Sequence, residues 1–175
     1  VTTALNDDVY ESSSNKPSDG SFRKDIYDVM KQIVKFLDEK KSPFLDNIYS
    51  FLCLYIKMKI FQRIMRSLKV TVKAPMTKMH ITPICLMQTL DTLVWSLKKM
   101  GHLNVSISVG EIGWPTDGDK NANDKNAIMF YQGFLKKMVR RKGTPLHPGP
   151  VNSYLFSLFD ENMKSVAPGD FERHW

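Results

Sequence analysis

The stretch LNVSISVGEIGWPTDG, residues 103–118, decides how the rest of the chain is interpreted. Its first half predicts a β-strand that delivers Glu111 at its C-terminal end. Gly113 then lets the chain turn, and Pro115 holds the Trp114 ring beside the carboxylate. A carboxylate next to an indole suits sugar chemistry, because the ring can stack on a pyranose while the acid attacks or stabilises the anomeric carbon. The alternative is a solvated loop acid beside a tryptophan that packs in the core.

Strands and helices alternate on both sides of this stretch. Further strands are predicted at residues 1–10, 43–52 and 151–159, and amphipathic helices at residues 22–41, 91–101 and 123–143. Asp91 lies near the start of the second of these helices, and Gly101 stops it. Gly143 ends the third helix. Four strands that alternate with helices predict an α/β protein with a parallel sheet.

Length and composition fit one globular domain. The chain has 175 residues, of which 42% are hydrophobic, and this is enough to bury an ordinary core. No run approaches the ~18 apolar residues of a membrane span. The first residues, VTTALNDDVYESSS, have neither a basic n-region nor an apolar h-region. Cys53 and Cys85 are too few for a disulfide framework and lack the spacing of metal ligands.

The net charge of +7 comes from one segment of the chain. Seven basic residues and no acidic residue lie between Asn47 and Leu90, and without those seven the remaining 18 basic residues balance the 18 acidic ones. Within this segment, KMKIFQRIMRSLK at residues 57–69 places apolar residues on one helical face and basic residues around the rest. Such a pattern is typical of a core helix, of a membrane-surface helix or of a helix that binds nucleic acid.

Residues 57–90 also differ in composition from both flanks, because they hold five of the ten methionines and no acid. Suppose that each true codon consists of the last base of one written codon and the first two bases of the next. Because methionine has a single codon, the amino acid that results across a methionine is then fixed at several positions. Met58 followed by Lys59 gives Glu, and Met76 followed by Thr77 gives Asp. The hidden text, which is the segment read in this other frame, is acidic, aromatic and loop-like, and it resembles the rest of the chain more than the residues as written do. We therefore interpret residues 57–90 as an out-of-frame segment and expect no membrane or nucleic-acid function from it.

A second group of polar residues, Asp160, Glu161 and Lys164, follows the last predicted strand directly. In a parallel α/β sheet the C-terminal ends of all strands share one face, so Glu111 and Glu161 are expected to open into the same site. A lysine near two acids can favour the ionised form of one of them. The alternative is a surface loop with compensating charges.

Several motifs together resemble the plant β-1,3-glucanases of glycoside hydrolase family 17. The Glu-x-Gly-Trp-Pro motif at residues 111–115 is the most specific of them. The others are NDDVYESSSNKPSDGSFRKDIYDVMKQIVKFL, PFLDNIYSFL, DTLVWSLKKMG, GTPLHPGP, YLFSLFDENMK and FERHW. The match covers nearly the whole chain except residues 57–90, and the hidden text of that segment is similar to the family as well.

This resemblance implies an α/β fold that is the C-terminal half, about strands five to eight, of a (β/α)₈ TIM barrel. Residues 1–175 would then be a partial catalytic domain. The resemblance also implies hydrolysis of 1,3-β-glucosidic linkages in callose or laminarin with retention of configuration, and without a cofactor. Glu111 matches the catalytic nucleophile of the family. A secreted protein in the cell wall or on the outer face of the plasma membrane is expected on the same ground.

The resemblance extends to five further positions. Trp114 matches a platform for sugar stacking next to the nucleophile. Glu161 and Lys164 match an active-site pair that supports the nucleophile and binds substrate, and Asn47 and Tyr49 match the cleft-lining end of the sixth strand. The expected partner is therefore β-1,3-glucan. Nucleic acid is not expected, and membrane contact is expected only through a possible lipid anchor in a full-length form.

Three positions depart from the family pattern. Ser50 stands where a proline is usual, and Ile112 stands where a small residue is common. Asp46 stands where an apolar residue is usual, which puts an acid into a strand that is buried on both faces.

The second carboxylic acid of a retaining mechanism has no match in the chain. Retaining enzymes hold two carboxyl groups about 5–5.5 Å apart. In this family the acid/base Glu precedes the stretch that matches residues 1–10, and Asp7, Asp8 and Glu11 do not lie in its motif. Half a barrel also leaves two parallel strand edges unpaired. We therefore expect the polypeptide as written neither to fold stably nor to hydrolyse glucan. The alternative function is a non-catalytic fragment or a glucan-binding remnant without the acid/base Glu.

No metal site is predicted. The stretch DGDKNANDKNAI, residues 117–128, resembles a calcium loop, but Ala122 and Ile128 replace the required Gly and Glu. The four histidines are scattered without the spacing of metal ligands.

Overall fold

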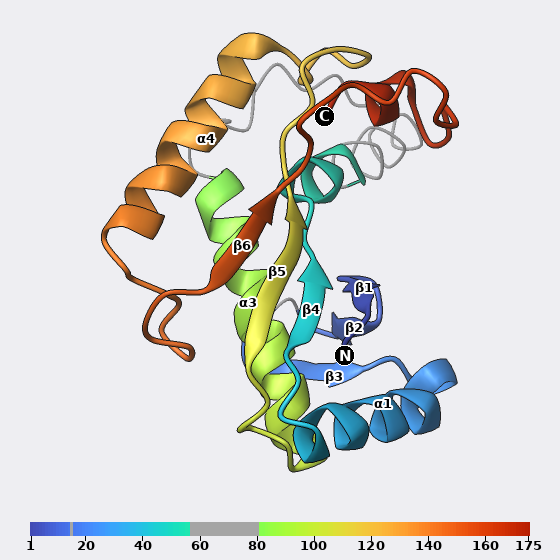
Figure 1. Ribbon diagram of the computed structural model, residues 1–175, viewed down its shortest axis with the longest axis vertical. Helices are drawn as coiled ribbons and strands as arrows, with labels where there is room; N and C mark the ends of the chain where they lie inside the picture. Colours follow the sequence, from blue (N-terminus) through green and yellow to red (C-terminus); the bar gives the residue numbers. More distant parts are fainter. Residues whose placement is uncertain (15, 57–80) are drawn as a thin grey trace.

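The computed structural model describes residues 1–14, 16–56 and 81–175, including their side chains except those of residues 81–84. Its centre is a four-stranded parallel sheet in the order β1 (Ala4–Asn6), β4 (Phe44–Asn47), β5 (Ile107–Ile112) and β6 (Asn152–Leu155). Figure 1 shows β4, β5 and β6 side by side and pointing the same way. The α/β class and the parallel sheet predicted from the alternation of elements are confirmed.

Helices connect the parallel strands. The long ones are α1 (Tyr27–Glu39), α3 (Ile81–Met100) and α4 (Asp124–Val139), which precede β4, β5 and β6 respectively. Residues 50–56 are also helical, and 3₁₀ turns occupy Pro17–Asp19 (η1), Lys24–Ile26 (η2) and Asp170–Arg173 (η3). Figure 1 shows α3 running along the sheet with α4 beside it. Each crossover between neighbouring parallel strands therefore contains a helix, as parallel pairing requires.

A two-stranded antiparallel hairpin, which the sequence did not indicate, follows β1. In it β2 (Tyr10–Ser12) pairs with β3 (Gly20–Phe22), and both strands pack against α3. Strands of three residues are too short to show the alternation by which a strand is predicted. The hairpin places the Tyr10 and Phe22 rings in the core, where they meet edge to face with their centres 6.5 Å apart.

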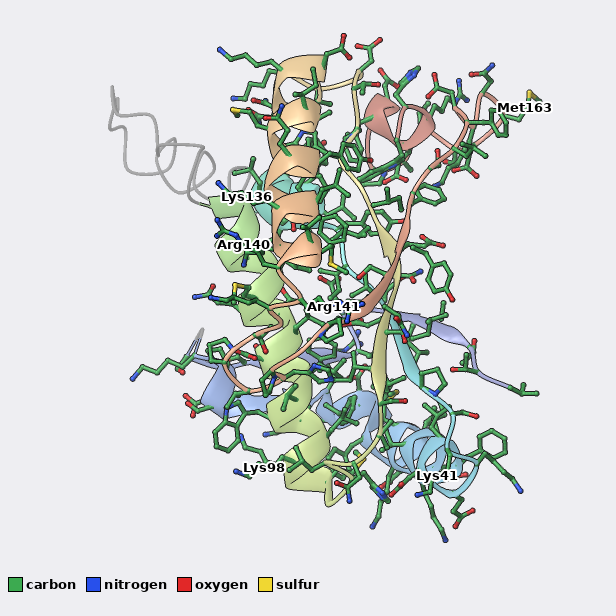
Figure 2. All side chains as sticks on the ribbon, turned by 60° about the vertical axis from the view of Figure 1, so that its left-hand side comes forward. Lys41, Lys98, Lys136, Arg140, Arg141 and Met163 are labelled. Atoms are coloured by element: carbon green, nitrogen blue, oxygen red, sulfur yellow. A yellow bond between two sulfur atoms is a disulfide. The ribbon has the colours of Figure 1, made fainter. Side chains whose placement is uncertain are left out.

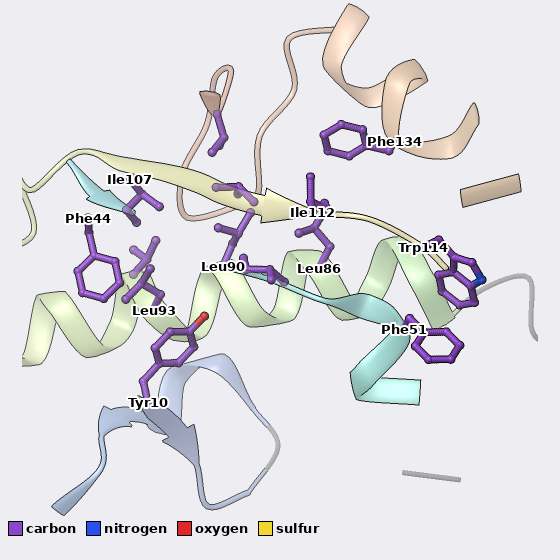
Figure 3. Close-up of a cluster of buried hydrophobic side chains, with 14 of the residues drawn as sticks. Tyr10, Phe44, Phe51, Leu86, Leu90, Leu93, Ile107, Ile112, Trp114 and Phe134 are labelled. Atoms are coloured by element: carbon purple, nitrogen blue, oxygen red, sulfur yellow. The ribbon is translucent and has the colours of Figure 1, made fainter. Parts of the chain in front are cut away.

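The core lies between the sheet and the helices. Each helix buries the stripe that a period of 3.6 residues puts on one of its faces. The buried side chains are Met30, Val34 and Leu37 in α1 and Ala127, Phe130 and Phe134 in α4. Figure 3 shows Leu86, Leu90 and Leu93 of α3 beneath the strands. Phe44 of β4 and Ile112 of β5 are fully buried, so these short strands are covered by apolar side chains.

Several predicted boundaries were wrong, since the strands predicted over residues 1–10 and 151–159 are only Ala4–Asn6 and Asn152–Leu155. β4 ends at Asn47 and residues 50–56 are helical, so the strand predicted over residues 43–52 is too long. A short apolar run has no periodicity that separates a buried strand from a buried helix. α3 begins at Ile81, so Asp91 lies in the middle of that helix and not near its start. Asp91 is buried there and accepts a hydrogen bond from the Leu146 N–H at 3.4 Å.

The helix ends are only partly as predicted. Gly101 follows α3 with a φ of +88°, which is the left-handed conformation expected of a glycine stop. After α4 the left-handed residue is Arg141, with a φ of 50°, and not Gly143. Figure 2 shows Lys136, Arg140 and Arg141 together at this end of α4. Positive charge is favourable there because the C-terminal end of a helix carries the negative pole of its dipole.

The segment interpreted as out of frame, residues 57–90, is described only in part. Residues 57–80, with the amphipathic stretch 57–69, lie outside the described residues. Residues 81–90 form the first half of α3. Cys85, in this half, forms a disulfide with Cys53, a pairing that the sequence did not indicate. The out-of-frame interpretation stays a prediction.

Two features are absent from the described residues. No helix in this part of the chain combines the length and the apolar character that crossing a membrane requires. The same residues contain no group of three or more His, Cys, Asp or Glu side chains that could hold a metal ion. In the stretch that resembles a calcium loop, Asn123 caps α4, because its side chain accepts a hydrogen bond from the Asn126 N–H at 3.1 Å.

Asp46 lies fully buried between the sheet and the hairpin. Its exposed fraction is 0%, and the Tyr10 hydroxyl donates to its Oδ2 at 2.6 Å. Its Oδ1 has no hydrogen-bond partner among the described residues. Burial raises the pKa of Asp46 to about 8, the hydrogen bond from Tyr10 lowers it, and the charge of Asp7 adds to the rise. Asp46 is therefore mostly protonated at neutral pH.

This pKa makes the stability of the fold depend on pH. A carboxyl group whose pKa is raised in the folded state stabilises the fold at pH values below its unfolded pKa of about 4. This stabilisation is lost as the pH rises toward the pKa of the folded state, which is about 8 for Asp46. Burial also raises the pKa of Asp7, to about 6, so Asp7 changes the stability mainly below pH 6. We expect the free energy of unfolding of the full-length protein, measured by chemical denaturation, to fall by about 2 kcal/mol between pH 6 and pH 8 because of Asp46.

Asp46→Asn removes the titrating group and keeps an oxygen that can accept from Tyr10, so most of this fall should disappear in that variant. Asp28→Asn removes the same charge from the exposed surface of α1 and should leave the pH dependence unchanged. An Asp46→Asn variant with the full pH dependence would contradict the assignment.

The approach of β6 to the turn after β5 gives a second prediction. A Cβ added to Gly113 would lie 2.0 Å from the Phe156 carbonyl oxygen, whereas a Cβ added to Gly133 in α4 would meet no atom within 4 Å. Gly113→Ala should lower the free energy of unfolding by about 2–3 kcal/mol, because backbone must move to admit the methyl group. Gly133→Ala should raise it by about 0.5–1 kcal/mol, because alanine is the better helix former. Thermal unfolding of both variants tests the pair, and equal stabilities would contradict it.

Candidate active site

The parallel pairing of β4 with β5 places the ends of both strands side by side. Asn47 is the register partner of Glu111, and the Ile48 N–H donates to the Glu111 carbonyl oxygen at 2.9 Å. The Glu111 side chain is partly exposed. It stands at the C-terminal edge of the sheet, which is the edge where parallel α/β proteins bind their ligands.

The Tyr49 phenol holds the Glu111 side chain. Its hydroxyl donates a hydrogen bond to Glu111 Oε2. Burial raises the pKa of Tyr49 well above its usual value, and the hydrogen bond to the Glu111 carboxylate raises it further. The phenol therefore keeps its proton and remains a donor at physiological pH. Among the described residues Glu111 Oε1 has no hydrogen-bond partner, so one carboxylate oxygen is held and the other is free.

Lys164 joins two acids in the segment that follows β6. Its Nζ lies 3.1 Å from Glu161 Oε2 and 3.4 Å from Glu172 Oε2. Burial works against the charged ammonium group, but the two ion pairs outweigh it and raise the pKa of Lys164 overall. The same Nζ lies 5.1 Å from the centre of the Phe156 ring, within the range of a cation–π contact. One ammonium group thus links two acids and an aromatic ring.

Hydrogen bonds close this segment into a loop. The Glu161 N–H donates to the Arg173 carbonyl oxygen at 3.0 Å, and Arg173 Nε donates to the Lys164 carbonyl oxygen at 2.6 Å. The chain returns through η3, which brings Glu172 back to Lys164. Met163 is 95% exposed at the tip of the loop (Figure 2), so the tip itself adds no apolar packing, whereas Phe171 at the base of the loop is fully buried.

Three carboxylates gather around the Tyr49 phenol. Glu111 accepts its hydrogen bond, and Glu161 and Glu172 pair with Lys164, which lies against the same Phe156 ring that Tyr49 contacts. The charges of Glu172 and Glu161 contribute to the raised pKa of Tyr49. The structure therefore brings the acid at the end of β5 and the acids after β6 to one place. A carboxylate with one free oxygen, an ammonium group and aromatic rings can together hold a polyhydroxylated ring and attack it.

Asn47 is packed at the end of β4 against Gly110 of β5. Its side chain is 9% exposed, and its Oδ1 has no hydrogen-bond partner among the described residues. A Cβ on Gly110 would lie 2.5 Å from this oxygen, so only glycine leaves room for the amide. The amide thus lies directly beside the strand that carries Glu111.

Trp114 is placed in the core and not on the wall of the site. It is 4% exposed, and its ring centre lies 5.3 Å from that of Phe51 and 5.7 Å from that of Phe130. Its indole N–H donates to the Asn121 carbonyl oxygen at 3.0 Å. Figure 3 shows the Trp114 ring next to Phe51. In this position the indole has no free face for a sugar, so the packing alternative describes it better than the expected platform.

Three residues without an individual role in the sequence analysis belong to this site. Glu172 pairs with Lys164, Phe156 lies beside that lysine, and the Trp175 ring lies 4.5 Å from the Tyr49 ring between centres. The motif FERHW, with an acid next to aromatic residues, is the signal that could have pointed to Glu172 and Trp175. Their contacts could not be predicted, because an irregular loop has no period that relates its residues.

Comparisons with known proteins support one family. Residues 1–175 match the family described as Glycosyl hydrolases family 17. Glucan endo-1,3-beta-glucosidase 5 of Arabidopsis thaliana is 49% identical over 181 residues, and glucan endo-1,3-beta-glucosidase 8 of the same plant is 44% identical over 184 residues. Both alignments cover 100% of this chain and 36% of the relative, so the chain spans about a third of the length of these relatives.

Solved structures have the same fold. CJP38, a beta-1,3-glucanase and allergen of Cryptomeria japonica pollen, matches 99% of this chain with 27% identity and a TM-score of 0.81. One of two plant beta-glucan endohydrolases with distinct substrate specificities matches 100% of it with 26% identity and a TM-score of 0.81. The matches cover 53% and 55% of those chains, and they confirm the predicted half of a (β/α)₈ barrel. The family match over the whole chain, the relatives and the fold agree, and the chain belongs to Glycosyl hydrolases family 17.

Proposed function

We propose that this chain supplies the nucleophile, Glu111, to an enzyme that hydrolyses 1,3-β-glucosidic linkages in β-glucans with retention of configuration. The observation that carries the proposal is the position of Glu111 at the C-terminal end of β5, with Tyr49 on one of its oxygens. The names of the relatives, glucan endo-1,3-beta-glucosidases, support the substrate class.

The proposed reaction has two steps. Glu111 Oε1 attacks the anomeric carbon while the bond to the leaving oxygen breaks, and that oxygen takes a proton from a second carboxylic acid. Water then attacks the anomeric carbon of the glycosyl ester, gives its proton to the same second carboxylate, and releases Glu111. By the family resemblance, the second carboxylic acid belongs to the strand that precedes the equivalent of β1.

Tyr49 orients the attacking carboxylate. Its hydrogen bond to Oε2 leaves Oε1 for the sugar and stabilises the negative charge before the attack. The charge on Glu111 disappears when the glycosyl ester forms and returns when water releases the carboxylate. A donor that prefers the charged form therefore assists the second step, in which Glu111 is the leaving group.

Lys164 and its two acids are suited to bind substrate and not to transfer protons. Glu161 and Glu172 are both paired with Lys164, so we assign them to substrate binding and not to the acid/base role. The three charged groups can instead accept from and donate to sugar hydroxyls. The Phe156 ring beside Lys164 offers an apolar face on which a pyranose can stack.

We further propose, from the family resemblance, that the enzyme acts in the cell wall or on the outer face of the plasma membrane, where callose-type glucans occur. Fractionation of plant tissue with an antibody against the full-length protein tests this location. Recovery in the cytosolic fraction alone would contradict it.

Replacement of Glu111 tests the mechanism in the full-length protein. Glu111→Ala should lower kcat on laminarin by about a thousandfold or more, because the step that forms the glycosyl ester is lost. Azide should restore turnover of a β-glucoside with a good leaving group, since it can enter the space left by the side chain. The product should then be the α-glucosyl azide, which NMR identifies by its anomeric coupling.

The matched control is Glu39→Ala, which removes a carboxylate from the exposed end of α1 and should leave kcat unchanged. With the parent protein, the first reducing ends released should have the β configuration. An α configuration would contradict retention. Binding of laminarin without any release of reducing ends would favour the glucan-binding alternative over hydrolysis.

A further inference from the structure

Trp175 lies where three parts of the candidate active site meet. Its ring centre is 4.5 Å from that of Tyr49, the residue that holds Glu111, and 6.4 Å from that of Phe156, the ring beside Lys164. Its Cε3 lies 3.4 Å from the position that a Cβ would take on Gly113, in the turn after Glu111. Trp175 itself is 8% exposed, so it contacts these parts from within the core.

Two further aromatic rings pack against the Trp175 indole and hold it in place. The Phe51 ring meets it edge to face at 5.9 Å and the Phe171 ring at 6.1 Å between centres. Its own main chain lies against the segment after β6, because the Trp175 carbonyl oxygen is within hydrogen-bond distance, 3.1 Å, of the Ser157 hydroxyl. A ring that is fixed by two other rings and by its backbone can act as a rigid wall for its neighbours.

Two aromatic rings flank the Tyr49 phenol. On one side of it the Phe156 ring stands edge to face at 6.1 Å and 87°, and on another the Trp175 indole packs at 4.5 Å and 56°. Tyr49 is only partly buried, so the remaining direction is open. Without the indole the phenol could turn away from Glu111, and a displacement of about 1 Å is enough to break a hydrogen bond or misalign a nucleophile.

We propose that Trp175 is a positioning residue, which holds the Tyr49 phenol on Glu111 Oε2 and thereby keeps the carboxylate aligned for attack. Its role is distinct from that of Trp114, whose ring packs between Phe51 and Phe130. The catalytic part of this inference rests on the function proposed above. The positional part, that Trp175 holds Tyr49 against Glu111, can be measured without any activity.

The experiment uses four single variants of the full-length protein and one double variant. Trp175→Leu removes the wall, and Trp175→Phe keeps an aromatic ring there and loses no hydrogen bond to the described residues, because the buried indole N–H has no partner among them. Tyr49→Phe removes the donor to Glu111. Phe130→Leu is the matched control, since it truncates a ring that is 6% exposed and that lies against Trp114, Tyr131 and Phe134.

Kinetics on laminarin give the first readout. Tyr49→Phe should lower kcat by about tenfold or more, because a hydrogen bond to a charged group is lost. Trp175→Leu should lower kcat to a similar extent with KM changed by less than about twofold, and Trp175→Phe should restore most of it. Phe130→Leu should keep the parent kcat. In the Tyr49→Phe background, Trp175→Leu should lower kcat only slightly further, because both substitutions remove the same hydrogen bond from Tyr49 to Glu111.

The second readout is independent of activity. The ¹³Cζ resonance of Tyr49, assigned by its absence from Tyr49→Phe, reports the hydrogen bond to Glu111. Trp175→Leu should shift this resonance toward that of a solvated tyrosine, whereas Trp175→Phe and Phe130→Leu should leave it in place. An unchanged resonance in Trp175→Leu would overturn the inference.

The two readouts separate the possible failures. A parent protein that does not hydrolyse glucan would overturn the proposed function, and the NMR measurement would still decide whether Trp175 positions Tyr49. Equal losses of kcat in Trp175→Leu and Phe130→Leu would mean that any damage to the core has this effect, and they would overturn the specific role. Additive losses in the double variant would overturn the route through Tyr49.

Discussion

The parallel register of β4 and β5 is the constraint on which the candidate active site depends. It pairs Asn47 with Glu111 and lets Ile48 donate to the Glu111 backbone, so the chain leaves β4 beside the end of β5. Tyr49 follows directly and reaches Oε2 of the carboxylate. Because side chains alternate along a strand, a slip of one residue would turn Glu111 to the opposite face and break this contact. The chemistry proposed for Glu111 thus rests on backbone pairing first and on side chains second.

The segment after β6 completes the site by a different kind of interaction. It contains little regular structure, and its shape comes from ion pairs of Lys164 and from the aromatic rings of Phe156, Phe171 and Trp175. Charges that neutralise one another can gather near Glu111 without a large net repulsion. These three rings supply the apolar contacts of the segment. A sheet end and an irregular loop therefore meet at Tyr49, which contacts both.

Asp46 is an acidic residue that lies fully buried in the sheet. Asp46 precedes the register pair Asn47 and Glu111, and it points to the Tyr10 side of the sheet with one oxygen unpartnered among the described residues. Its protonated form fits this environment and its ionised form does not. The stability of the strand that carries the site is thereby linked to pH through a group that takes no part in the proposed reaction.

The sequence by itself determined the α/β class, the four parallel strands, the position of Glu111 at the C-terminal end of a strand, the positions of Glu161 and Lys164 beyond the last strand, and the family, because periodic apolar patterns and short motifs are local. It did not determine the end of β4, the start of α3 or the hairpin, since short apolar runs and very short strands carry no distinctive period. Only the tertiary structure decided that Trp114 belongs to the core, that Glu172 reaches Lys164, and that Trp175 packs on Tyr49. These are contacts between segments far apart in the chain, and packing and charge, not local pattern, select them.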